Sequence, residues 1–189
     1  DLAEEAKSGM ILDSRILFNK LEDETMERLK EEFSGRDDFD RLELRVAKVL
    51  KVEDHPNADK LYRIQLDLGN EKRQLVAGLK PYYEKEELEG HRIIMIANLE
   101  PAKLRGEKSE GMLLAVEEED EVAVLTTKAQ VGTRVSAGKH AEPDEQVTFD
   151  DFMKVKIESN KGRITYKDRE LKAADEEVFA EKPLSGRVH

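Results

Sequence analysis

The stretch "ANLEPAKLRGEKSEGM", residues 97–112, gathers cations in an otherwise acidic chain. The 189 residues carry a formal net charge of −11 at pH 7, yet Lys103, Arg105 and Lys108 fall within six positions. Guanidinium and ammonium groups are the side chains that hold phosphate in nucleic-acid complexes. In an extended chain Lys103 and Arg105 point to the same side. We therefore predict that this loop contacts a phosphate backbone.

Small polar residues accompany these cations. Asn98 and Ser109 carry short groups that can read a base edge or a sugar hydroxyl. Gly106 and Gly111 permit a close backbone approach. The alternative is a solvated hairpin whose lysines only keep the protein soluble, and the residue types alone leave both interpretations open.

A second candidate is "HPNADKLYRI", residues 55–64, a turn followed by a strand pattern. Lys60 and Arg63 place cations on the flank of that strand. Asn57 is expected to stabilise the turn through a side-chain hydrogen bond. His55 is expected to be a turn residue rather than a ligand.

Three tyrosines are candidates for stacking on bases, namely Tyr62, Tyr82 and Tyr83. Tyr62 lies on the apolar face of its predicted strand, which favours a place in the core. The pattern around Tyr83 leaves its role open.

The sequence contains no recognisable catalytic constellation. Cysteine is absent, which excludes disulfides and thiolate metal sites, and the four histidines have no metal-ligand spacing. Neither a glycine-rich phosphate loop nor a nucleophile elbow occurs. We expect no catalytic residue, no metal site and no cofactor in this segment.

The composition indicates a folded, charge-rich protein. Hydrophobic residues make up 38% and charged residues 40%, and Val, Ile and Leu recur in strand patterns. No apolar run approaches the roughly 20 residues that span a membrane. The lack of cysteine agrees with a cytoplasmic location. The chain begins with Asp rather than Met, which suggests a piece of a longer protein.

Period-two alternation predicts a barrel. Residues 42–127 are predicted to form three strands, a short helix over residues 81–90, and further strands. This order is typical of a small closed barrel of the OB type. We predict a mainly β fold with a five-stranded OB-fold barrel. The continuous apolar run in 91–99 predicts a strand buried on both faces, and the first strand should contain a bulge. The expected strands cover residues 42–54, 61–69, 73–79, 91–99, 111–117 and 122–127.

The flanks differ from the barrel. Residues 22–33 have helical spacing, so residues 1–38 are interpreted as a helical linker that ends in a hinge. The barrel then covers 39–135, and 136–189 form a β-rich C-terminal extra lobe. Its expected short strands include residues 147–152, 152–159, 162–168 and 177–182.

Three stretches together resemble a known family: "LRVAKVLKVEDHPNADKLYRIQLDLG", "LVAGL" and "ANLEPAKLRGEKSEGMLLA". They are similar to the tRNA-binding OB domain of methionyl-tRNA synthetases, of free dimeric tRNA-binding proteins and of endothelial-monocyte-activating polypeptide II. The resemblance covers residues 42–135. It implies structure-selective tRNA binding, without catalysis in this segment, that helps a catalytic domain to capture its tRNA.

The resemblance also suggests roles for individual residues. Lys103 and Arg105 would hold phosphate, while Asn98 and Ser109 would either set the loop or touch the nucleotide. The expected tRNA-binding set is Lys60, Arg63, Asn98, Lys103, Arg105, Lys108, Ser109 and Gly111.

The flanks extend this resemblance. Residues 15–33 are similar to the end of the anticodon-binding domain of methionyl-tRNA synthetases, which implies a C-terminal piece of such a synthetase. Residues 136–189 resemble the C-terminal lobe of endothelial-monocyte-activating polypeptide II, the cytokine-precursor member of this family, in which the lobe mimics a dimer interface. The expected partners are tRNA and the rest of the synthetase chain or a synthetase partner, with no membrane. A monomer and a homodimer both remain open.

Three rival functions are weighed against this one. The first is a dimerisation or complex-assembly module with incidental RNA contact, and the second is an OB barrel for other single-stranded ligands. An enzyme is the third, and the lack of a nucleophile or metal constellation speaks against it. If RNA binds, the acidic run "EEEDE", residues 117–121, should lie away from it.

Overall fold

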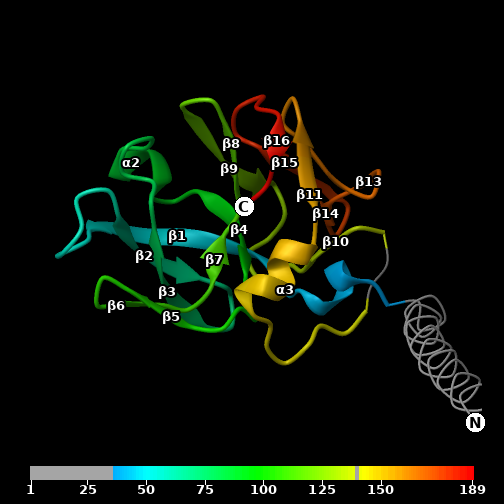
Figure 1. Ribbon diagram of the computed structural model, residues 1–189, viewed down its shortest axis with the longest axis horizontal. Helices are drawn as coiled ribbons and strands as arrows, with labels where there is room; N and C mark the ends of the chain where they lie inside the picture. The colour runs from blue at the N-terminus through cyan, green and yellow to red at the C-terminus, as the bar shows by residue number, and fades with distance from the viewer. Residues whose placement is uncertain (1–35, 139–140) are drawn as a thin grey trace, which may run out of the picture. The chain divides into compact units, whose positions relative to one another are not determined.

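The structure is a computed structural model that describes residues 36–138 and 141–189. The helix expected over residues 22–33 lies outside the described residues. The described part is mainly β with few and short helices, as predicted (Figure 1). Within this part of the chain, no helix has the length and apolar character that a membrane span requires.

A long first strand organises the barrel. It pairs antiparallel with β2 on one side and with β4 on the other, and its register with β2 shifts between Val49 and Lys51. This shift is the bulge predicted from the sequence. The sheet contains, in spatial order, β3 (Lys72–Ala77), β2 (Tyr62–Asp67), β1 (Leu44–Asp54), β4 (Arg92–Ile96) and β7 (Met112–Leu113).

The remaining barrel elements follow the predicted order. The short helix α2 (Lys85–Leu88) precedes β4, and β8 (Ala115–Glu118) forms a hairpin with β9 (Glu121–Thr127). The strand expected over 111–117 is interrupted at Leu114, where β7 ends before β8 begins. Between β4 and β7 the chain forms a separate two-stranded hairpin, β5 (Ala102–Leu104) and β6 (Glu107–Ser109).

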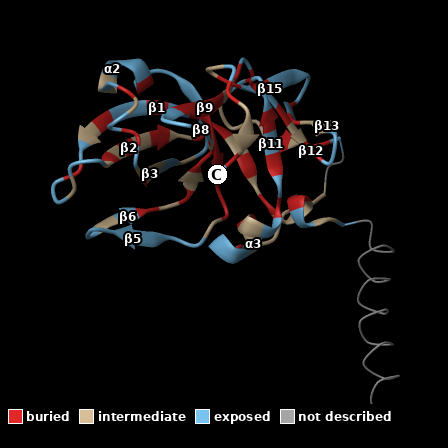
Figure 2. Ribbon diagram, turned by 45° about the horizontal axis from the view of Figure 1, so that its top comes forward, coloured by how far each residue is buried: buried red, intermediate tan, exposed pale blue. Residues whose placement is uncertain are grey.

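Strand β4 is buried on both faces, as its continuous apolar run predicted. Figure 2 shows that buried residues of the barrel strands face inward and exposed residues lie on the outer loops. Ile93 and Met95 pack into the barrel core with residues of β2 and β3. Ile94 and Ile96 point to the opposite face and pack into a second core shared with the C-terminal extension. The extension therefore covers an apolar surface that the barrel alone would leave in water.

The extension adds a large sheet and one helix. Its strands join β8 and β9 in a nine-stranded sheet. The elements are β10 (Val135–Ser136), α3 (Phe149–Lys154), β11 (Ile157–Asn160), β12 (Arg163–Tyr166), β13 (Arg169–Glu170), β14 (Lys172–Ala173), β15 (Glu176–Ala180) and β16 (Gly186–Arg187).

Two predicted strands of the extension are wrong in whole or in part, because the strand expected over 152–159 begins only at Ile157. Residues 147–152 were expected to be extended, but Phe149–Lys154 form helix α3. Thr148 caps this helix, because its hydroxyl accepts a hydrogen bond from the Asp151 N–H while the Asp151 carboxylate accepts from the Thr148 N–H. This reciprocal capping box stabilises a helix start and overrides the alternating pattern.

Arg41 connects the start of the barrel with the extension. It lies in the 3-10 turn η1 (Asp38–Arg41), and its guanidinium donates to Asp144 at 2.8 Å and to Asp151 at 3.1 Å. In the same turn, Phe39 is buried and stacks on Tyr166 with ring centroids 5.0 Å apart.

We predict that Asp151→Asn lowers the free energy of unfolding at pH 7 by about 1 kcal/mol, because it weakens the cap and the ion pair with Arg41. Hydrogen bonds from the Thr148 N–H and hydroxyl hold the pKa of Asp151 well below its ordinary value of 3.8. A depressed pKa means that this stabilisation is present above pH 3.8 and is lost as the pH falls further.

Urea unfolding at neutral and at acidic pH measures this effect. The difference between wild type and Asp151→Asn should shrink as the pH falls below 3.8. Asp150→Asn, a substitution of the exposed neighbouring carboxylate, is the matched control. A difference that stays constant with pH would contradict the assignment.

Candidate nucleic-acid interface

The hairpin β5–β6 holds three of the predicted cations. Lys103 pairs with Lys108 across the two strands, and the turn between them consists of Arg105 and Gly106 with φ of +52° and +95°. Two central residues with positive φ are the signature of a type I′ hairpin turn. The hairpin is therefore a tight, regular element rather than an irregular loop.

The structure corrects the geometry expected for these cations. The extended chain assumed for Lys103 and Arg105 ends at Leu104, so Arg105 lies in the turn. Lys108 is instead the residue that shares a face with Lys103, because residues directly opposite on paired strands lie about 5 Å apart on one face. Two like charges so placed repel each other unless an anion lies between them.

Three cations of the predicted set are exposed and available. Within the described part of the chain, Lys60, Lys103 and Arg105 have no carboxylate at ion-pair distance. Lys108 is also exposed, but its Nζ lies 2.9 Å from Glu110 Oε1. The hairpin thus presents positive charge that its neighbours leave largely uncompensated.

The acidic residues of the same loop also contact the wall of the barrel. Glu110 Oε2 accepts a hydrogen bond from the Gln74 N–H, and the hydrogen bonds from Lys108 and Gln74 hold the pKa of Glu110 below its usual range. Glu107 Oε2 lies 3.3 Å from an Arg63 nitrogen. Glu107 therefore pairs with the barrel residue Arg63, whereas Glu110 is bound to the barrel wall and also pairs with the exposed Lys108.

Arg63 is placed differently from the hairpin cations. It is half-buried, with one guanidinium nitrogen 3.3 Å from Glu107 and another 3.3 Å from Glu53. Two carboxylates therefore already share its charge. Its position indicates a link between β1, β2 and β6 rather than a cation free to meet phosphate.

Asn98 is buried and its amide is fully used. Its Oδ1 accepts from the Glu43 N–H at 2.9 Å, and its Nδ2 donates to the carbonyls of Arg41 and Asp144, both at 2.9 Å. Of the two roles expected for this residue, these contacts favour setting the loop over touching a nucleotide.

Ser109 and Gly111 also serve the protein itself. The buried Ser109 hydroxyl accepts from the Val76 N–H at 3.1 Å and donates to the Gly111 carbonyl at 3.0 Å. Gly111 has a φ of +142°, and a Cβ at this position would lie 2.6 Å from the Ile96 carbonyl oxygen. The close backbone approach expected at Gly111 is therefore an approach to β4.

The loop between β1 and β2 touches the tip of the hairpin, which sequence reasoning missed. The ring of His55 lies 2.9 Å from the Leu104 carbonyl oxygen, and the Asn57 amide donates to the Arg105 carbonyl at 3.4 Å. These contacts join the loop that contains Lys60 to the hairpin. The motif "HPNADK" indicates a turn, but a contact across 49 positions is not visible in a local pattern.

Two of the three tyrosines are excluded as stacking platforms. Tyr62 and Tyr83 are buried, and the Tyr62 hydroxyl donates to the Tyr83 carbonyl at 3.0 Å. The Tyr83 hydroxyl accepts from the Val124 N–H, and burial raises its pKa to about 12. Tyr62 therefore takes the core position that its strand face predicted.

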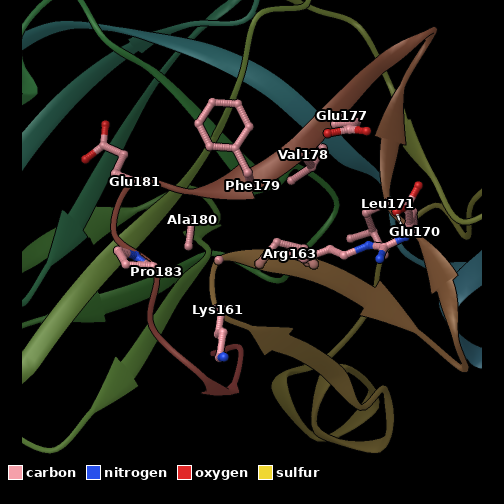
Figure 3. A pocket seen from close by; sticks show the side chains of 12 residues that line it. Lys161, Arg163, Glu170, Leu171, Glu177, Val178, Phe179, Ala180, Glu181 and Pro183 are labelled. Carbon is pink, nitrogen blue, oxygen red and sulfur yellow. Dashed lines mark ion pairs between the residues drawn. The ribbon is translucent and has the colours of Figure 1, made fainter.

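A cleft of about 620 Å³ in the extension differs from the hairpin β5–β6 in the charge of its lining residues (Figure 3). Its cations Lys161 and Arg163 are accompanied by three carboxylates, and Arg163 forms an ion pair with Glu170. The carboxylates of this cleft therefore outnumber its cations, which does not favour a polyanion. Among the described residues, no group of three or more acidic or histidine side chains is arranged to hold a metal ion.

The acidic run lies away from the hairpin. Residues 117–121 form the tip of the β8–β9 hairpin, and Figures 1 and 2 both place this tip apart from β5–β6. The positive hairpin and the negative hairpin are therefore separate surface features of one barrel.

Taken together, these features define a small OB-like barrel with a tight, positively charged hairpin on its surface. Residues 44–134 match a family described as "Putative tRNA binding domain", and this segment of the chain belongs to that family.

Relatives of this segment are found within longer proteins. Methionine-tRNA ligase of Thermococcus kodakarensis is 55% identical over 108 residues, which is 56% of this chain and 15% of the ligase. The ligase of Pyrococcus horikoshii is 46% identical over 136 residues, which is 69% of this chain and 19% of the ligase. The chain thus spans less than a fifth of the length of these two relatives.

A solved structure also includes the extension. The C-terminal domain of Plasmodium vivax p43 has a TM-score of 0.75 and 27% identity, and the alignment covers 82% of this chain and 100% of that one. Residues 1–134 alone are too few to supply that share. The likeness therefore continues into the C-terminal extension.

We predict that Asn98→Ala lowers the free energy of unfolding by about 2–3 kcal/mol, because three backbone groups lose a buried partner. Urea unfolding measures this loss. Asn70→Ala is the control, since the exposed Asn70 side chain accepts one hydrogen bond among the described residues, from Arg45. Equal losses in the two variants would count against a structural role for Asn98.

Proposed function

We propose that residues 39–135 bind tRNA through the hairpin β5–β6 and the adjoining β1–β2 loop, with residues 136–189 as a supporting extension. The observation that supports this most strongly is the exposure of Lys103 and Arg105 without a carboxylate at ion-pair distance in the described part of the chain. Cations that the protein does not neutralise attract the phosphate backbone of RNA.

The residues of the predicted set divide into two groups in this proposal. Lys60, Lys103, Arg105 and Lys108 contact phosphate, because all four are exposed on the hairpin or on the loop bonded to its tip. The other four hold the hairpin in place, because their contacts are made within the protein. These four are Arg63, Asn98, Ser109 and Gly111.

Structure selectivity follows from rigidity. A type I′ hairpin fixes the spacing of its cations, so only phosphates with a matching spacing are bound well. A folded RNA offers such a fixed arrangement, whereas a flexible strand must lose entropy to adopt it. We therefore assign the site to folded tRNA rather than to unstructured oligonucleotides.

We further propose that the parent protein is a methionine-tRNA ligase that carries this domain in its C-terminal part. The domain itself then contributes no catalytic step. A tethered binding site raises the local concentration of tRNA near a catalytic domain to the millimolar range. Weak binding by this domain is sufficient for capture, and it allows release after aminoacylation.

We predict that the double substitution Lys103→Glu and Arg105→Glu lowers tRNA affinity at least tenfold, because two phosphate contacts become repulsive. The slope of log K against log salt concentration should decrease by about 2 in magnitude. Filter binding at several salt concentrations measures both quantities.

The matched control for this prediction is Lys128→Glu with Lys156→Glu. It produces the same change in net charge at exposed lysines outside the hairpin. Equal loss of affinity in the two double variants would show that only net charge matters and would reject the hairpin as the site.

We predict that folded tRNA displaces labelled tRNA at a lower concentration than an unstructured oligonucleotide of equal length does. The reason is the fixed spacing of the hairpin cations described above. A gel-shift competition measures the two midpoints. Equal midpoints would favour the interpretation as an OB barrel for single-stranded ligands.

A complex-assembly module is the alternative function. The apolar outer face of β4, which includes Ile94 and Ile96, is already covered by the chain's own extension. That coverage leaves this face unavailable to a second copy, which favours RNA binding over dimerisation through this surface. Light scattering separates the two, since a dimer without tRNA affinity would support assembly.

A further inference from the structure

The loop residue His55 contacts the hairpin at its most constrained point. The ring is buried at 5% relative exposure, although the loop around it is largely exposed. One ring nitrogen, Nε2, lies 2.9 Å from the Leu104 carbonyl oxygen, and the other, Nδ1, lies 3.0 Å from the Asn57 backbone nitrogen. The imidazole therefore bridges the β1–β2 loop and the last residue of β5.

The two contacts determine the tautomer. The Asn57 N–H can only donate, so His55 Nδ1 must accept and carries no proton. The Leu104 carbonyl can only accept, so Nε2 must donate its proton. His55 is thus a neutral imidazole with its proton on Nε2, and both of its polar atoms are used.

The turn that follows Leu104 needs such support. Arg105 has a φ of +52°, a region that non-glycine residues rarely adopt, and such conformations persist where the surroundings hold them. Asn57 supplies a second restraint, because its Nδ2 donates to the Arg105 carbonyl. Two consecutive carbonyls of the hairpin tip are therefore held by one short loop.

We propose that His55 is a positioning residue of the tRNA site, and this proposal rests on the proposed function. Its Nε2–H holds the Leu104 carbonyl and thereby keeps Arg105 and the Lys103–Lys108 pair at the spacing that folded RNA requires. His55 itself does not touch the RNA. The motif "HPNADK" then contributes to binding through the hairpin that it restrains.

The two amide substitutions of His55 separate its two hydrogen bonds. His55→Asn places a carbonyl oxygen near the position of Nδ1, so it retains the bond from the Asn57 N–H in an Asx-type turn but cannot reach Leu104. His55→Gln places an N–H donor near the position of Nε2, so it retains the bond to the Leu104 carbonyl. Both variants remove the imidazole ring and its packing. A difference between them therefore reports which of the two hydrogen bonds matters for binding.

We expect His55→Asn to weaken tRNA binding about tenfold, whereas His55→Gln stays within about threefold of wild type, as the loss of one restraining hydrogen bond suggests. Filter binding gives the dissociation constants. Urea unfolding of both variants shows whether the barrel remains folded under the assay conditions.

Each outcome decides the proposal. Loss of affinity in His55→Asn with partial rescue by His55→Gln, at similar stability, supports it. Equal affinities in the two variants, or losses that follow only their stability, overturn it and leave the site on Lys103 and Arg105 intact. Failure of the wild-type protein to bind tRNA removes the proposed function and, with it, this role of His55.

Discussion

The position of the cationic hairpin depends on hydrogen bonds at the edge of strand β3. The Val76 N–H donates to the Ser109 hydroxyl, the Gln74 N–H donates to the Glu110 carboxylate, and the Glu110 N–H donates to the Gln74 carbonyl. Side chains thus satisfy backbone donors that an open sheet edge would expose. The same bonds hold Glu110 at the barrel wall, where its other carboxylate oxygen pairs with Lys108. Among the described residues, Lys103 and Arg105 are therefore the hairpin cations without a carboxylate at ion-pair distance.

The second constraint is the strand that is apolar on both faces. Ile93 and Met95 complete the barrel core, whereas Ile94 and Ile96 would be exposed without the extension. Several polar contacts reinforce this cover, among them the bonds from Arg41 to Asp144 and Asp151 and those from Asn98 to both parts of the chain. Asn98 is adjacent to the hairpin segment in sequence, so the extension also restrains the base of that segment. The C-terminal extension and the candidate site are therefore linked through Asn98, although they lie in different sheets.

Local patterns predicted the barrel strands because alternation reports which side of a strand is buried. They also predicted the double burial of β4, since a continuous apolar run has no solvent face. The pattern failed at residues 147–152, where the pairing of Thr148 with Asp151 outweighed an apparent alternation. The cations of the site were identified from residue type, but not their arrangement, because a turn at Arg105 separates the strands. The contact between His55 and Leu104 arises only from the tertiary fold, so no local spacing could have indicated it.

An acidic protein can bind a polyanion when its charges are separated in space. At physiological ionic strength the Debye length is about 8 Å, so a surface charge acts mainly on its immediate surroundings. The acidic tip of β8–β9 and the cationic hairpin occupy different regions of the barrel (Figure 1). A phosphate at the hairpin therefore experiences Lys103, Arg105 and Lys108 more strongly than the net charge of −11. The overall negative charge still opposes binding of RNA elsewhere on the surface. In the proposed function, positive charge confined to one hairpin favours a single orientation of the RNA, and such an orientation is what delivery of tRNA to a catalytic domain would require.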